Sequence, residues 1–134
     1  TLAGKYSEEF NIYAGPKETL QNSISLFKSV ASENGREEKT LEITTACPPV
    51  VGLTKESVDN SLISAAKALI QPEDEIAKNW QDRSYLYGTP EDVVKTLSMW
   101  QEVGIEAVYL QLLDLEQSKR DESVEVIQKA INLL

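Results

Sequence analysis

The spacing of hydrophobic and polar residues switches between the period of a strand and that of a helix along the chain, and each switch predicts the end of an element. Residues 9–13 (EFNIY) alternate in polarity and end at Ala14-Gly15-Pro16, which predicts a short strand followed by a helix start. The next apolar residues lie at helical spacing up to Asn34-Gly35, where the helix should end. Residues 41–47 (LEITTAC) are rich in strand formers and stop at Pro48-Pro49, which predicts a second strand.

The middle of the chain predicts two helices and one short extended segment. Thr54 is a helix-capping residue, and apolar residues follow it at helical spacing until Pro72. Residues 73–80 favour a second, shorter helix, and residues 85–87 favour a brief extended segment.

The last third of the chain contains the clearest helix start. In Thr89-Pro90-Glu91-Asp92, Thr89 fits the N-cap, proline fits the first helical position, and the carboxylates favour the positive end of the helix dipole. Gly104 should end this helix. Residues 105–113 (IEAVYLQLL) are nearly all apolar, which predicts a strand buried on both faces. A final helix is expected to carry its apolar face on Val124, Ile127, Ile131 and Leu134.

This order of elements predicts an α/β fold, because strands that alternate with helices form parallel sheets with right-handed crossovers. The chain has 134 residues, of which 41% are hydrophobic, enough for the core of one domain or of part of one. No apolar run approaches the roughly 18–20 residues that a membrane helix needs. We therefore expect a globular protein without a membrane span.

Charge and residue usage exclude several kinds of chemistry. The net charge of −9 disfavours contact with the phosphate backbone of nucleic acids. The chain contains no His, which excludes a Ser-His-Asp triad and His-based metal sites within it. The single Cys excludes an intrachain disulfide and fits a reducing compartment, so we expect a cytoplasmic location. Because the chain starts at Thr1 and not at Met, we expect a processed chain or a fragment.

Three segments resemble, in the right order, the bacterial luciferase-like monooxygenase superfamily. Residues 5–11 (KYSEEFN) are similar to the family pattern K/R-Y-A-D-E-W-N, and residues 29–39 (SVASENGREEK) stand where the family has a helix end of the kind C-E-E-x-G-R-D-P. Residues 87–115 resemble its last βα portion, with a G-T-P-E-D-V helix start, a V-G helix end and a terminal V-Y-L-Q-L strand. The most similar branch uses the deazaflavin coenzyme F420.

The resemblance implies the C-terminal portion of a TIM barrel, the (β/α)₈ fold. Such a barrel needs eight strands and about 250 residues, whereas this sequence predicts three strands and one brief extended segment. We therefore expect residues 1–134 to form a single partial domain, an incomplete barrel on its own. The family's glycine-rich turn and the first-half loops that make its main cofactor contacts would lie before Thr1.

For function, the resemblance implies part of an oxidoreductase that uses coenzyme F420 or, alternatively, FMN. The reaction would be hydride transfer or monooxygenation of a small organic substrate, with this chain supplying one side of the pocket and no catalytic residue. Its partners would be that substrate and either the missing N-terminal half of the barrel or a second copy of itself, so we expect a homo-oligomer.

Three residues at the expected strand ends are candidates for cofactor binding, because barrel enzymes hold ligands at the carboxyl ends of their strands. Asn11 and Tyr13 could hydrogen-bond a cofactor or substrate, or could pack at the end of their strand. Gln111 interrupts an otherwise apolar strand, and a polar group buried there requires a ligand or an internal hydrogen-bond partner.

Arg83 is the candidate for substrate binding. In related deazaflavin-dependent sugar-phosphate dehydrogenases, an arginine at the matching distance before the Thr89 cap helps to bind the substrate phosphate, a role that suits the guanidinium fork. The alternative is a surface arginine that pairs with Asp82 or Glu75. Those relatives also carry a phosphate-binding lysine where this chain has Pro16, followed by a lysine, so the sequence departs from the sugar-phosphate pattern there.

The remaining notable residues are expected to be structural. Cys47 is more typical of a buried small side chain than of a reactive thiol, and Trp80, Trp100 and Met99 are more typical of a core or interface than of cofactor stacking. The acidic run 73–75 is typical of solvated carboxylates at a helix start, and we expect no metal site.

A rival interpretation is a stand-alone, non-catalytic α/β module. A sheet of three or four parallel strands leaves unpaired edges and uncovered strand faces, and such a module would self-associate through its open sheet.

Overall fold

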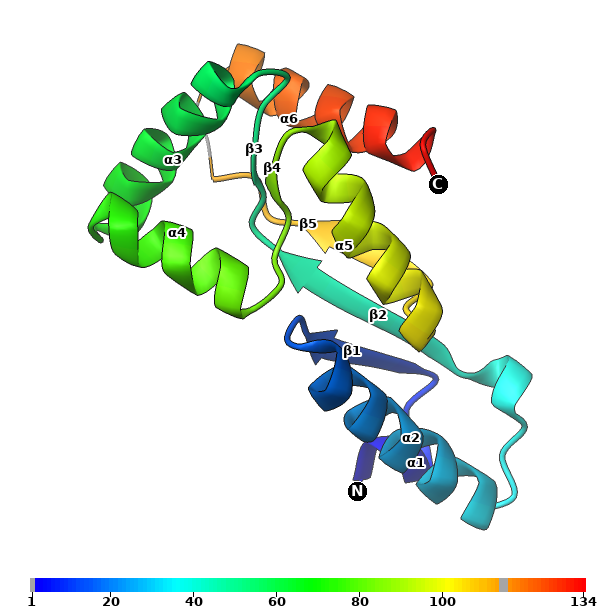
Figure 1. Ribbon diagram of the computed structural model, residues 1–134. Coiled ribbons are helices and arrows are strands. Elements are labelled where there is room, and N and C mark those ends of the chain that lie inside the picture. The colour runs from blue at the N-terminus through cyan, green and yellow to red at the C-terminus, as the bar shows by residue number, and fades with distance from the viewer. Residues whose placement is uncertain (1, 114–115) are drawn as a thin grey trace.

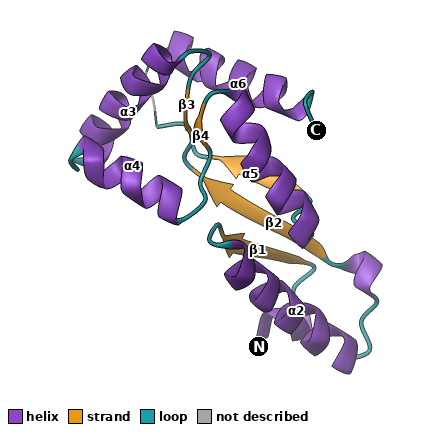
Figure 2. Ribbon diagram, viewed as in Figure 1, coloured by secondary structure: helices purple, strands orange, loops and turns teal. Residues whose placement is uncertain are grey.

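The computed structural model describes residues 2–113 and 116–134 and shows helices alternating with parallel strands (Figure 1, Figure 2). The strands form one parallel sheet in the order β1-β2-β5 and a separate parallel pair, β3-β4. The elements in chain order are α1 (Leu2–Tyr6), β1 (Glu9–Tyr13), α2 (Lys17–Glu33), the 3₁₀ helix η1 (Glu38–Thr40), β2 (Glu42–Cys47), β3 (Val50–Val51), α3 (Lys55–Leu69), α4 (Glu73–Asp82), β4 (Tyr87–Gly88), α5 (Pro90–Val103), β5 (Ala107–Leu110) and α6 (Gln117–Ile131). The fold is therefore α/β with an open parallel sheet, as the sequence predicts.

Helices cover one face of the three-stranded sheet and leave the other face open. Ile12, Ile43 and Cys47 are buried on the covered face. Figure 1 shows α2 and α5 over this face, where the two helices contact each other. The helices complete this core with Leu20, Ile24, Phe27, Val93, Leu97, Trp100, Val126, Ile127 and Ala130.

The helix boundaries follow the local signals in the sequence. At the start of α5, the Asp92 carboxylate accepts hydrogen bonds from the N–H of Thr89 at 3.3 Å and from its hydroxyl at 3.1 Å. The helix ends at Gly104, whose φ of 90° lies in the left-handed region. At the start of α3, Thr54 Oγ1 accepts from the N–H of Ser57 at 3.1 Å. The predicted helix starts and the glycine stop are thus confirmed.

A second, smaller core joins α3 and α4 to the β3-β4 pair. Its buried residues are Val50, Ala65, Ile76 and Trp80. The indole Nε1 of Trp80 donates to the carbonyl of Pro48 at 2.7 Å, which ties the last turns of α4 to the carboxyl end of β2. The extended segment expected at 85–87 is a strand at Tyr87–Gly88, paired with Val50–Val51. The sequence did not predict β3, because two residues carry no periodicity.

The last strand is shorter and more exposed than the sequence predicts. It spans only Ala107–Leu110, and Tyr109 is 53% exposed. The prediction of a strand buried on both faces is therefore wrong for the described residues. The physical reason is position: β5 is an edge strand whose neighbour among the described residues is β2, and no helix covers its open face.

Of the four apolar residues predicted for the buried face of the final helix, Ile127 is buried and the other three are exposed. The buried residues of this helix are Ser123, Val126, Ile127 and Ala130. Val124 and Ile131, both expected in the core, are 51% and 48% exposed, and Leu134 lies beyond the helix end and is also exposed. Because Ser123 and Ala130 are small, they allow closer approach to the rest of the fold than larger side chains would.

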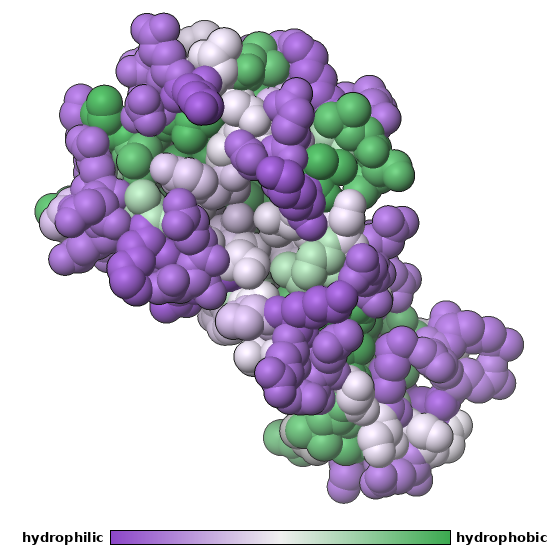
Figure 3. All heavy atoms as spheres, viewed as in Figure 1, coloured by the Kyte–Doolittle hydropathy of each residue, from purple (hydrophilic) through white to green (hydrophobic). Residues whose placement is uncertain are grey.

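The surface in Figure 3 is largely hydrophilic, in keeping with the net charge of −9. A hydrophobic patch lies near the C-terminal end of α6 (Figure 3), where Ile131, Leu133 and Leu134 are exposed. In the part of the chain that the structure describes, no helix is long and apolar enough to cross a membrane.

Candidate functional site

The open face of the sheet carries polar side chains at the carboxyl end of β1. Asn11 and Tyr13 alternate with the buried Ile12, so they lie on the face that the helices leave open. Tyr13 is 84% exposed, so the packing expected as the alternative role for this side chain is not observed within the described residues. Both side chains are therefore accessible to a ligand at the strand end.

Gln111 reaches the same face from the other edge of the sheet. Its N–H donates to the carbonyl of Cys47 at 3.1 Å, which extends the β2-β5 ladder one residue beyond β5. Alternation along the strand then places Gln111 on the same side as Tyr109. The side chain is exposed, so the expectation of a buried amide is wrong for the described residues, because β5 is an edge strand with one face uncovered.

Asn11 is held by a chain of hydrogen bonds that the sequence analysis did not identify. Its Nδ2 donates to Oγ1 of Thr44 at 2.8 Å, and the same hydroxyl donates to Oε1 of Glu9 at 2.6 Å. Thr44 is fully buried although it lies on the open face. A buried hydroxyl bonded on both sides fixes the orientation of the amide. The alternation along β1 predicts that Glu9 and Asn11 lie on the same face of the sheet. That Thr44 lies beside them depends on the register between β1 and β2, which the local sequence does not specify.

Tyr109 adds a phenol to this face. The negative charge of Glu9 raises the pKa of the Tyr109 phenol above its usual value, and Glu42 adds to the effect. Glu9 and Glu42 lie opposite each other at the amino ends of β1 and β2. The phenol therefore stays protonated at neutral pH and remains a hydrogen-bond donor.

Arg83 does not lie on this face but directly after α4. It caps the C-terminus of α4, where its N–H donates to the carbonyl of Asn79 at 3.0 Å, and its side chain is exposed. Asp82, one of the two carboxylates considered as its partner, pairs with Lys78 instead. The structure thus places Arg83 on the helix that the Trp80 indole ties to the carboxyl end of β2.

Lys17, the lysine that follows Pro16, forms an ion pair with Glu102 of α5. Both side chains are about half exposed, so this pair contributes little to stability. The Glu102 carboxylate would repel a phosphate from the Lys17 ammonium group, so Lys17 is a poor candidate for the second cation of a phosphate site.

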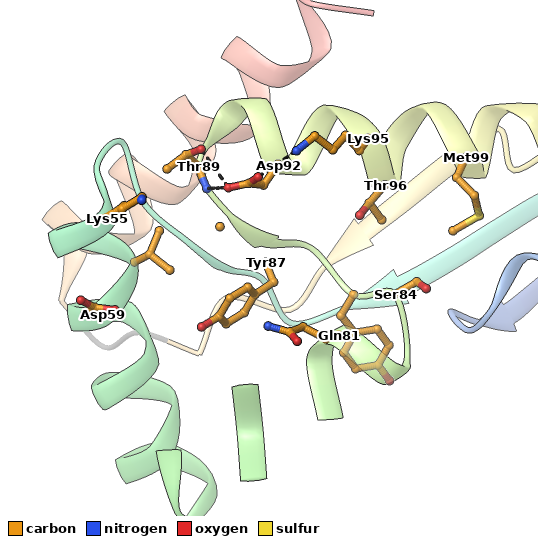
Figure 4. Close-up of a pocket in the computed structure, with 13 residues that line it drawn as sticks. Lys55, Asp59, Gln81, Ser84, Tyr87, Thr89, Asp92, Lys95, Thr96 and Met99 are labelled. Carbon is orange, nitrogen blue, oxygen red and sulfur yellow. Dashed lines mark hydrogen bonds and ion pairs between the residues drawn. The ribbon is translucent and has the colours of Figure 1, made fainter. Parts of the chain in front are cut away.

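A cavity of about 670 Å³ lies between α3, the end of α4 and the start of α5 (Figure 4). Tyr87 projects into it in Figure 4, with Asp59 and Gln81 nearby. Burial raises the pKa of the Tyr87 phenol, and the charge of Asp59 adds to this. None of the four candidate residues from the sequence lines this cavity.

Asp92 also lines this cavity, and its carboxylate already bonds to Thr89 and Lys95. The hydrogen bond from Lys95 at 3.1 Å, followed by those from Thr89, holds the pKa of Asp92 below its usual value. Its role is to cap α5. Within residues 2–113 and 116–134, no group of three or more Cys, Asp or Glu side chains is placed to hold a metal ion.

Solved structures of two F420-dependent enzymes and of a monooxygenase share this fold. An F420-dependent secondary alcohol dehydrogenase, in complex with an F420-acetone adduct, matches 96% of this chain with a TM-score of 0.68 at 20% identity. EDTA monooxygenase from Chelativorans sp. BNC1 matches 98% with a TM-score of 0.71 at 14% identity. The coenzyme F420-dependent tetrahydromethanopterin reductase from Methanopyrus kandleri matches 94% with a TM-score of 0.63 at 15% identity. These proteins are members of the luciferase-like monooxygenase superfamily, and the likeness establishes the fold.

This chain spans less than half of each of these solved chains: 44% of the alcohol dehydrogenase, 42% of the EDTA monooxygenase and 46% of the reductase. Neither a family model nor a curated protein matches the sequence.

Proposed function

We propose that residues 1–134 are the C-terminal βα units of a luciferase-like barrel, a single partial domain that forms one side of the pocket of an oxidoreductase. The enzyme would use coenzyme F420 or FMN to transfer a hydride to or from a small organic substrate, or to monooxygenate it. One observation carries the proposal: Asn11, Tyr13 and Gln111 share the helix-free face at the carboxyl ends of parallel strands. Barrel enzymes bind their ligands at that end of the sheet.

The side chains on this face fit the polar edge of a flavin or deazaflavin ring. The amides of Asn11 and Gln111 each offer a donor and an acceptor, and the Tyr13 phenol offers both in one group. When bound, the cofactor supplies the redox chemistry. The role of this chain is to bind and orient the ring, with the Thr44 hydroxyl fixing the Asn11 amide, and we assign it no catalytic residue.

We also propose that Arg83 contributes to substrate binding. Its guanidinium is exposed at the end of α4, and Asp82 is engaged with Lys78. Lys17, the lysine that follows Pro16, pairs with Glu102 and is therefore a weaker candidate than Arg83 for binding a phosphate. This supports a small substrate with a single anionic or polar group near Arg83.

Equilibrium titration of coenzyme F420 and of FMN tests the proposal. The chain is titrated alone and in a mixture with the part of the F420-dependent secondary alcohol dehydrogenase that it does not match, produced as a separate polypeptide. We expect saturable binding of one cofactor in the mixture and none by the chain alone. Asn11→Ala or Gln111→Ala should weaken binding about tenfold, the value of one hydrogen bond of about 1.4 kcal/mol.

Asn22→Ala and Gln21→Ala are the matched controls, because both residues are exposed on α2, which packs on the opposite face of the sheet from Asn11 and Gln111. They should bind as the unchanged chain does. Saturable binding by the chain alone, or binding in the mixture that ignores Asn11 and Gln111, would contradict the proposal. An oligomer of this chain that binds neither cofactor would favour the non-catalytic module.

A further inference from the structure

The hydrogen bonds between Glu9, Thr44 and Asn11 have a direction that is fixed at the glutamate. The hydroxyl of Thr44 lies 2.6 Å from Oε1 of Glu9 and 2.8 Å from Nδ2 of Asn11. Glu9 is exposed at the start of β1, and an exposed glutamate is ionised at neutral pH, so its carboxylate can only accept hydrogen bonds. The 2.6 Å separation is typical of a hydroxyl that donates to a carboxylate. The hydroxyl proton of Thr44 therefore points toward Glu9.

The direction of this bond decides which atom of the Asn11 amide faces Thr44. A threonine hydroxyl carries one proton, and here Glu9 accepts it. The hydroxyl can then only accept from Asn11, so the amide turns Nδ2 and not Oδ1 toward Thr44. Because Thr44 is fully buried, water does not compete for its hydroxyl. The charge of Glu9 thus sets the orientation of the Asn11 amide through an intervening side chain.

Oδ1 of Asn11 is the atom that this orientation leaves for a ligand. The side chain is exposed, and among the described residues no donor bonds to Oδ1. An amide oxygen is an acceptor with two lone pairs, and enclosing it without a donor weakens binding. The ligand group that lies against Asn11 should therefore carry an N–H or an O–H.

We propose that Glu9, acting through Thr44, makes Asn11 a hydrogen-bond acceptor for the imide N–H of the flavin or deazaflavin ring. Glu9 is then a positioning residue that determines specificity without touching the ligand. This inference rests on the proposed function, because it takes the ring as the ligand of the open face. The imide N–H, at ring nitrogen N3, lies between two carbonyl groups. An amide turned the other way would present its two N–H groups and would favour one of those carbonyl oxygens instead.

Glu9→Gln and Glu42→Gln form a matched pair that tests the direction of these hydrogen bonds. The two residues are exposed and lie opposite each other at the amino ends of β1 and β2, so each variant removes one charge from the same end of the sheet. The amide introduced by Glu9→Gln can donate as well as accept. Thr44 is then free to donate to Asn11, and the Asn11 amide can take either orientation. Glu42 lies outside this hydrogen-bonded group, so Glu42→Gln should leave it unchanged.

The side-chain amide of Asn11 reports on its own orientation in the chain alone. Its two protons give a pair of resonances in a ¹⁵N–¹H spectrum, and Asn11→Ala identifies the pair. We expect the proton that bonds to Thr44 to lie downfield of free asparagine amides in the unchanged chain and in Glu42→Gln. This shift should fall by half or more in Glu9→Gln and should vanish in Thr44→Val. Circular dichroism verifies that each variant is folded.

Methylated cofactors test whether the imide N–H is the donor. FMN and coenzyme F420 are each compared with the analogue methylated at N3, by equilibrium titration of the mixture with the unmatched part of the F420-dependent secondary alcohol dehydrogenase. The unchanged chain and Glu42→Gln should bind the N–H form at least tenfold more tightly, the value of one hydrogen bond of about 1.4 kcal/mol. Glu9→Gln should reduce this preference threefold or more. Because Glu9→Gln leaves the room around Asn11 as it is, a reduced preference reports hydrogen-bond direction and not exclusion of the methyl group.

The outcomes separate this inference from the proposed function. An Asn11 amide that responds alike to Glu9→Gln and to Glu42→Gln overturns the inference, as does equal binding of a cofactor and its N3-methyl analogue. Cofactor binding that Asn11→Ala weakens, with a preference for the N–H form that Glu9→Gln does not reduce, overturns the inference and leaves the function standing. If Glu9→Gln releases the amide but no cofactor binds in the mixture, the fixed orientation stands, and the proposed function and the ring as ligand are both contradicted.

Discussion

The hydroxyl of Thr44 stands between the amide of Asn11 and the carboxylate of Glu9, accepting one hydrogen bond at 2.8 Å and donating another at 2.6 Å. The three side chains come from two neighbouring strands and lie on the open face of the sheet. Because Thr44 is fully buried, no water can take the place of its hydroxyl without a rearrangement. The orientation of Asn11 therefore depends on a residue that would not itself touch a ligand.

Replacing that hydroxyl by a methyl group should destabilise the fold. Thr44→Val keeps the shape of the side chain but leaves the Asn11 amide and the Glu9 carboxylate without their partner. We expect a loss of about 1–3 kcal/mol in the free energy of unfolding, measured by urea denaturation. Thr44→Ser keeps the hydroxyl, so it should lower the free energy of unfolding less than Thr44→Val does. If Thr44→Ser destabilised the fold as much as Thr44→Val, the hydrogen bonds of the hydroxyl would contribute no more to stability than the methyl group of Thr44 does.

The part of the fold that the sequence predicts is the part that depends on local signals. Thr89 and Gly104 mark the ends of α5 through capping and a left-handed turn, both of which act within a few residues. The alternation of residues 9–13 likewise indicates β1 and which of its residues share a face. Asn11 and Tyr13 could for this reason be chosen as site candidates from the sequence alone.

The features that the sequence misses depend on packing between distant segments. Thr44 joins the site because β1 and β2 pair in one particular register. Ile131 is exposed because the small residues Ser123 and Ala130 turn another face of α6 toward the core. Gln111 is exposed because β5 is an edge strand. Helical or strand periodicity identifies an apolar face but does not specify which neighbour, if any, covers it.

The two tryptophans should respond differently to replacement by phenylalanine. Both side chains are buried and lose the same atoms, but Trp80→Phe also removes the hydrogen bond to Pro48, whereas Trp100→Phe removes a donor that has no partner among the described residues. We expect Trp80→Phe to lower the free energy of unfolding by about 1 kcal/mol more than Trp100→Phe. Chemical denaturation of the two variants side by side measures the difference. A larger loss in Trp100→Phe would mean that its indole is bonded in solution.

The contribution of the α5 cap to stability can be measured by substitutions in the first turn of the helix. Asp92→Ala removes the carboxylate that accepts from Thr89 and pairs with Lys95, and should cost about 0.5–2 kcal/mol. Glu91→Ala removes a charge from the same turn without touching these hydrogen bonds and should cost less. Thermal unfolding monitored by circular dichroism compares the two. Similar melting temperatures for the two variants would indicate that these carboxylates stabilise α5 through the helix dipole alone, and not through the hydrogen bonds of the cap.

The thiol of Cys47 should make the stability of the fold depend on alkaline pH. Burial raises its pKa from 9.0 to about 11. Because the pKa in the folded state is above that of the unfolded chain, the stabilisation from the neutral thiol is complete below about pH 9 and is lost as pH rises toward 11.

The pH dependence of urea unfolding between pH 8 and 11 measures this effect, in the unchanged chain and in Cys47→Ala. The unchanged chain should lose more stability over this range than the variant does. A thiol reagent at pH 8 should also label the native protein far more slowly than the urea-unfolded chain. Rapid labelling of the native protein would contradict the burial of this side chain.

Gly52 lies so close to the first turn of α3 that no other residue fits there. A Cβ atom at this position would stand 2.5 Å from backbone atoms of Ser57 and Val58, which cannot move without breaking the helix start. Gly52→Ala should therefore lower the free energy of unfolding by about 1–3 kcal/mol or more. Gly15→Ala is the matched control, because nothing lies within 4 Å of its Cβ position, and it should change stability by less than about 0.5 kcal/mol. Equal urea midpoints for the two variants would show that the β3-α3 turn is looser in solution.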